Sequence, residues 1–124
     1  MPDSALGDWL KGLRADRNWS LREVAQRAGV DHAYVYRLET GVKESPSIEV
    51  IDKLIVALTP SPRDVEILHF LTGHPNVDPG LAEFARGDAS VSPQEFHILT
   101  TVVNRGARAD YATSLARIRK FMSE

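Results

Sequence analysis

Residues 25–41 read AQRAGVDHAYVYRLETG, and this stretch decides the fold. Gly29 stands where a left-handed backbone is most easily adopted, and Asp31 is a good N-cap for a short helix that runs to about Glu39. With about 100° of turn per residue, Val35 and Leu38 fall on one side of that helix. The stretch therefore predicts a tight turn followed by a short helix with one apolar face.

The opposite side of this helix carries small and polar side chains, those of His32, Ala33, Tyr36, Arg37 and Thr40. A helix, a glycine turn and a second short helix with an exposed polar face form the helix-turn-helix arrangement. Such a helix fits the major groove of DNA, where His, Tyr and Arg can hydrogen-bond to base edges and Ala33 can contact a thymine methyl. An αα-hairpin that merely buries its apolar face would give the same pattern, so geometry alone leaves both interpretations open.

The rest of the chain also has the helical period. Leu6, Leu10 and Leu13 are spaced as on one helix face, and Ser20-Leu-Arg-Glu23 is a capping box. Further helix starts are predicted at Ser47 and at three sites where a capping residue precedes Pro, which are Ser61-Pro62, Asp78-Pro79 and Ser92-Pro93. A last helix is predicted from about Asp110 to Met122, and no strand or repeat stands out. We expect eight short helices and an all-α fold.

The bulk composition restricts the class of protein. The chain has 124 residues, 43% of them hydrophobic, and no cysteine, so disulfides and thiolate metal sites cannot hold it together. No apolar run approaches the roughly 20 residues that span a bilayer, and the N-terminus does not resemble a signal peptide. We expect a cytoplasmic protein with no membrane partner.

Charge is unevenly distributed. The net charge is −2, a weak argument against a nucleic-acid partner. The window from Lys11 to Lys43, however, holds seven cations against four anions, which makes it locally +3. A solvated helical face would look the same, so charge alone does not decide between the two.

The ordered set of residues from 19 to 47 resembles the Cro/cI-type (XRE) helix-turn-helix family. The matching positions are Ser20, Glu23, Ala25, Gly29, Val30, Val35, Leu38, Glu39, Gly41 and Pro46. The likeness covers about residues 6–72, the five-helix domain of that family, and implies a protein that binds double-stranded DNA.

The resemblance also implies roles for individual residues. The base-reading positions of the family correspond to His32, Ala33, Tyr36 and Arg37, and its phosphate contacts correspond to Arg22, Tyr34 and Lys43. One position departs from the pattern, because Leu21 stands where the family usually has a Gln that clamps a phosphate. Arg22 could compensate for that loss.

The predicted division of the chain is a DNA-binding domain, 1–74, and a small helical dimerisation or regulatory region, 75–124, with the seam near Gly73-His74-Pro75-Asn76. The second region is too short to bury its apolar side chains alone. Either dimerisation or packing onto the first domain would cover them. For a homodimer, the predicted contact residues are Phe96, Leu99, Val103, Tyr111, Leu115 and Ile118.

The C-terminal segment from Ser92 is also loosely similar to repressors that are regulated by ImmA/IrrE-type metallopeptidases. That resemblance implies a partner metallopeptidase and a cut at Asn104-Arg105. The leading hypothesis is a homodimeric repressor of a palindromic operator. The alternative is an antitoxin or protein-interaction module that neutralises a toxin partner and regulates its own operon.

Several residues have structural explanations that we favour. Glu39 is expected to be an acceptor near the helix end, and Trp9 and Trp19 are expected in or beside the core. The histidines His69, His74 and His97 lack metal-ligand spacing. We expect no metal, no cofactor and no enzymatic activity.

Overall fold

The computed structural model describes residues 4–42, 46–102 and 110–123, and these residues form helices and no strand. The helices are α1 (Ala5–Asp16), α2 (Leu21–Ala28), α3 (His32–Glu39), α4 (Ile48–Leu58), α5 (Pro62–Thr72), α6 (Pro79–Gly87), α7 (Pro93–Leu99) and α8 (Tyr111–Met122). The predicted all-α class is confirmed.

Side-chain caps explain where the helices begin. Each of the eight starts behind a Ser or Asp whose side chain accepts a backbone N–H from the first turn. Ser92 and Glu95 form a complete capping box, with N···O distances of 3.0 and 2.9 Å. At the start of α2 the Ser20 hydroxyl accepts from the Glu23 amide, while the Glu23 carboxylate turns toward Arg27.

The hydrophobic core is built around α1, which packs against α3, α5 and α6. Trp9 of α1 is fully buried, and its indole N–H donates to the backbone carbonyl of Asp64 over 3.1 Å. Burying a large aromatic ring while satisfying its one donor makes this contact both apolar and directional. The expectation that Trp9 belongs to the core is confirmed.

The core continues past the predicted seam at residue 74. Leu81, Ala82 and Ala85 of α6 are buried in the same cluster as the side chains of α1. Arg63 of α5 lies over the Trp9 ring and donates to the backbone carbonyls of Ala85, Asp88 and Val91. The apolar side of α6 is therefore covered by packing onto the first part of the chain. This packing is one of the two ways in which the sequence predicts that the apolar side chains of residues 75–124 are buried.

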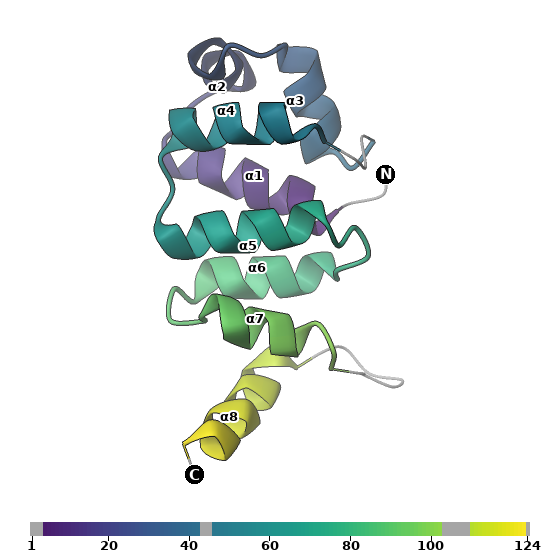
Figure 1. The fold of residues 1–124 in the computed structure, drawn as a ribbon, viewed down its shortest axis with the longest axis vertical. Helices are drawn as coiled ribbons and strands as arrows, with labels where there is room; N and C mark the ends of the chain where they lie inside the picture. Colours follow the sequence, from purple (N-terminus) through teal and green to yellow (C-terminus); the bar gives the residue numbers. More distant parts are fainter. Residues whose placement is uncertain (1–3, 43–45, 103–109, 124) are drawn as a thin grey trace.

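The helices are stacked along the long axis of the molecule, with α1 between α4 and α5 (Figure 1). Helices α2 and α3 lie at one end, and α8 lies at the opposite end. Among the described residues, no helix is long and apolar enough to cross a membrane.

Candidate nucleic-acid interface

The turn between α2 and α3 depends on Gly29. Its backbone has φ 70° and ψ 37°, the left-handed conformation that costs an ordinary L-residue about 1–2 kcal/mol. The N–H of Val30 then closes on the carbonyl of Ala25 over 3.0 Å. This turn ends α2 and lets α3 start three residues later at a new angle, as the sequence predicted.

Helix α3 has the buried apolar face and the exposed polar face that the helical period predicts. Val35 and Leu38 are 2% and 0% exposed, whereas Tyr36 is 50% exposed. His32 and Arg37 are also exposed, and Ala33 lies half-buried between them. All four predicted base-reading side chains thus lie outside the core, on one short helix at the end of the molecule (Figure 1).

The start of α3 is held by Asp31. Its carboxylate accepts from the Ala33 amide over 3.2 Å and lies 3.8 Å from Nδ1 of His32. A carboxylate at a helix N-terminus is favoured by the helix dipole. Asp31 therefore fixes the first turn and places a carboxylate near the imidazole.

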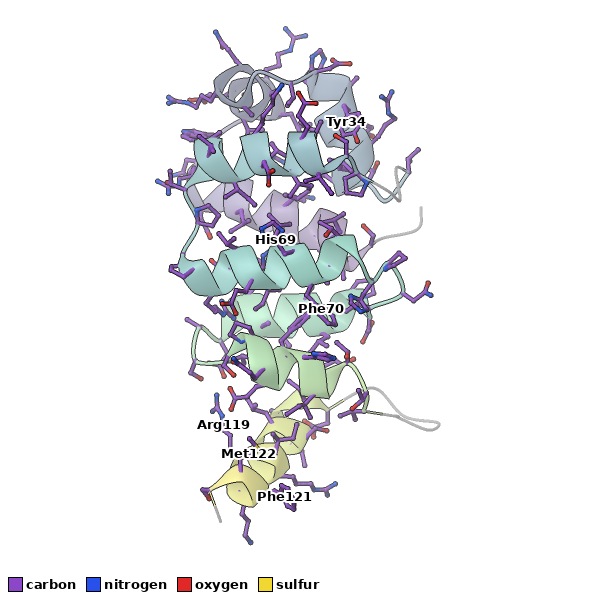
Figure 2. The ribbon with its side chains drawn as sticks, viewed as in Figure 1. Tyr34, His69, Phe70, Arg119, Phe121 and Met122 are labelled. Carbon is purple, nitrogen blue, oxygen red and sulfur yellow. The ribbon has the colours of Figure 1, made fainter. Side chains whose placement is uncertain are left out.

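Tyr34 connects α3 to α4. The Ser47 amide donates to the Tyr34 hydroxyl oxygen over 3.1 Å, and the guanidinium carbon of Arg37 lies 5.9 Å from the centre of the Tyr34 ring. Tyr34 is half-buried (its position is shown in Figure 2). The ring therefore supports Arg37 from one side through a cation–π contact.

Behind α3, Glu39 makes a bidentate ion pair with Arg14 of α1. Nε and Nη2 of Arg14 donate to the two carboxylate oxygens over 2.8 and 2.9 Å, and Nη1 donates to the carbonyl of Trp19 over 2.9 Å. The hydrogen bond to Glu39 raises the pKa of Arg14 above its ordinary value. Glu39 is thus the structural acceptor that we expected. The sequence does not predict its partner Arg14, because 25 positions separate the two residues and no local periodicity connects them.

The predicted phosphate contacts have different surroundings. Arg22 is exposed near the start of α2, on the same end of the molecule as α3. Leu21, at the position of the family's usual Gln, is half-buried against the core. Trp19 is also half-buried, with the Arg27 guanidinium 4.5 Å from its ring centre. Lys43 lies outside the described residues.

The residues predicted for a dimer contact are used within their own chain. Phe96, Leu99 and Leu115 are buried in the core, and Tyr111 and Ile118 pack against it. Val103 lies outside the described residues, as do Asn104 and Arg105 of the predicted cut site.

The histidines have ordinary neighbours. His74 stacks on Phe70 with ring centres 3.9 Å apart, His97 lies 4.9 Å from the same ring, and His69 is exposed on α5 (Figure 2). In the part of the chain that the structure describes, no group of three His, Cys, Asp or Glu side chains is placed to hold a metal ion.

Comparison with known proteins agrees with this geometry. Residues 5–68, more than half of the chain, match a family model described as a helix-turn-helix domain. The HTH-type transcriptional regulator SinR of Bacillus subtilis (strain 168) is 32% identical over 53 residues, which are 43% of this chain and 48% of SinR. SinR of Bacillus licheniformis gives the same figures. The chain thus spans about half the length of the curated relatives it matches.

Proposed function

Because this chain belongs to the XRE-type helix-turn-helix domain family, we propose that it is a transcriptional regulator that binds double-stranded DNA in a sequence-specific manner. The observation that carries the proposal is the division of α3, whose aliphatic side is sealed in the core while Tyr36 and Arg37 point outward.

In the proposed complex, α3 enters the major groove. Arg37, braced by the Tyr34 ring, hydrogen-bonds to base edges together with His32 and Tyr36, and Ala33 contacts a thymine methyl. Arg22, Tyr34 and Lys43 contact phosphates, which position the helix without reading the sequence. The SinR relatives, named as transcriptional regulators, support this role.

We further propose that the regulator acts as a homodimeric repressor on a palindromic operator. One short helix meets few base pairs, and each wrong pair costs about 1–3 kcal/mol, so one copy discriminates weakly. Two copies with their α3 helices about 34 Å apart would meet two successive major grooves on the same side of the duplex.

The test begins with selection of preferred duplexes from a random pool. Fluorescence anisotropy then gives the affinity for the selected duplex and for a scrambled duplex at several salt concentrations. Arg37→Ala should lose about 1–3 kcal/mol of discrimination between the two duplexes. Arg22→Ala should weaken both affinities alike and reduce the salt slope by about 1 for each lost phosphate contact.

The two variants are controls for each other, since each removes one exposed guanidinium from the same end of the molecule. If Arg37→Ala keeps the parent's full discrimination, α3 is not the base-reading element. If the parent selects no duplex at all, the DNA-binding proposal fails as a whole.

A further inference from the structure

Helix α8 is attached to the molecule along one side only. Of its twelve residues, Leu115 is the buried one, and α7 is the helix it packs against most. Two polar contacts hold its ends, because Tyr111 donates to Asp78 over 2.6 Å and Arg119 pairs with Glu95 over 2.9 Å. The opposite side of α8 faces outward.

The outward side ends in an apolar and basic tip. Phe121 and Met122 are 78% and 68% exposed at the far end of the molecule (Figure 2). Arg117 and Lys120 are exposed too, and at about 100° per residue they lie within a turn of Phe121 and away from Leu115. The tip therefore combines a large unburied ring with positive charge.

The start of α8 borders a groove of opposite character. A cavity of about 810 Å³ lies between α6 and the first turn of α8. Its acidic side chains are those of Asp78, Glu83, Asp88 and Asp110. Phe84 and Tyr111, whose ring centres are 5.9 Å apart, supply an apolar wall.

From this complementarity we infer that α8 pairs with α8 of a second copy of the chain, in an antiparallel arrangement about a twofold axis. The basic, aromatic tip of each copy lies against the acidic groove of the other. The inference rests on the homodimer in the proposed function, and it names the surface that forms it.

The lengths and charges fit such a pair. Ten residues separate Tyr111 from Phe121, which is about 15 Å of helix, so antiparallel pairing brings each tip to the other copy's groove. The contact is self-complementary, because every tip-to-groove interaction occurs twice. Helix α8 lies at the end opposite α3 (Figure 1), so pairing through it leaves both base-reading helices uncovered.

The test reverses the sign of one charge on each side of the contact. In a homodimer of the Lys120→Glu variant, each tip brings a negative charge against the acidic groove of the other copy. In a homodimer of the Glu83→Lys variant, each groove brings a positive charge against the basic tip of the other copy. Mixed together, the two variants can form a heterodimer in which both contacts are again attractive. Lys120 and Glu83 are both exposed, so neither change should disturb the fold.

Sedimentation velocity without DNA gives the dimer dissociation constants. We expect each variant alone to dimerise about tenfold more weakly than the parent, and the equimolar mixture to return to within about threefold of it. Phe121→Ser should weaken the dimer about a hundredfold, since it removes two buried rings. Lys11→Glu on α1 and Glu66→Lys on α5, both exposed, are controls that should leave the constant unchanged.

A parent chain that stays monomeric, single variants as tight as the parent, or a mixture as weak as its components would each overturn the inference. None of these results bears on DNA recognition, because the mass is measured without DNA. Conversely, a dimer with the expected charge pattern that selects no duplex overturns the proposed function and leaves the α8 pairing intact.

Discussion

Glu39 fixes α3, the proposed base-reading helix, to α1 through its ion pair with Arg14. It is 9% exposed, and its carboxylate is turned inward to Arg14 and away from the outer side of α3. A carboxylate on the outer side would be repelled by phosphates. One side chain thus removes an unfavourable charge from the surface and joins the ends of α1 and α3.

Replacing this carboxylate by an amide tests its contribution. Glu39→Gln should lower the free energy of unfolding by about 3 kcal/mol, because the Arg14 guanidinium, 18% exposed, loses its charged partner. Urea denaturation followed by circular dichroism measures the change.

Glu23→Gln is the matched control. It breaks the exposed Glu23–Arg27 pair, with an N···O distance of 3.5 Å, and should cost less than about 0.5 kcal/mol. Equal losses in the two variants would mean that the Arg14–Glu39 pair contributes no more than a surface pair.

The sequence predicts the local role of such residues, but it does not predict which distant residue each of them contacts. Asp31, Gly29 and Ser92 act within a few positions of themselves, so local pattern identifies their roles. The Tyr34–Ser47 contact spans 13 positions and crosses from one helix to another. Contacts of this kind depend on how the helices cross, and the spacing of residues along the sequence does not predict the crossing.

At the scale of elements, Gly7 of α1 lies close against the backbone at the end of α3. A Cβ atom at Gly7 would lie 2.5 Å from the carbonyl oxygen of Glu39 and 2.6 Å from that of Leu38. Both are backbone atoms, so they can retreat only if α3 itself moves. Gly7 therefore sets the position of the helix that carries Arg37.

Gly7→Ala should displace α3 and destabilise the protein by about 2 kcal/mol or more, in spite of the better helix propensity of alanine. Urea denaturation gives the energy, and amide chemical shifts of residues 32–39 report the displacement.

Gly87→Ala is the control, because a Cβ atom there meets nothing within 4 Å. It should be neutral or stabilising by up to about 1 kcal/mol. If Gly7→Ala is equally well tolerated and leaves the α3 shifts in place, the close approach does not position α3.

The elements themselves were predictable from the sequence, because each start carries its own signal. Ser61, Asp78 and Ser92 before Pro mark α5, α6 and α7, and all three helices begin there. These signals do not predict which helices pack together. The side chains of Phe96 and Leu99 looked available for a partner, and in the fold they fill the chain's own core.

At the scale of the whole molecule, one continuous core joins the regions on either side of residue 74. Phe96 of α7 lies 6.4 Å from Trp9 of α1, ring centre to ring centre, and Arg86 of α6 pairs with Asp16 over 3.1 Å. The seam predicted at Gly73-His74-Pro75-Asn76 is the connection between α5 and α6. The separate domains 1–74 and 75–124 remain a prediction, and this packing favours a single cooperative unit.

We expect the chain to unfold in one transition. Trp fluorescence, which reports on buried Trp9 and half-buried Trp19, and far-ultraviolet circular dichroism should give the same urea midpoint. A fragment of residues 1–77 should unfold at lower urea than the full chain, because it uncovers the side of α1 that α6 protects. Two separate midpoints, or a fragment as stable as the whole chain, would favour two domains.

The length of the molecule has a mechanical consequence. Helix α3 and the C-terminal tip lie at opposite ends of the molecule (Figure 1). With two copies paired at that tip, a small change in the angle between them would produce a large change in the distance between their α3 helices. Substitutions around Phe121 should then alter the number of base pairs tolerated between half-sites while leaving the bases within each half-site unchanged.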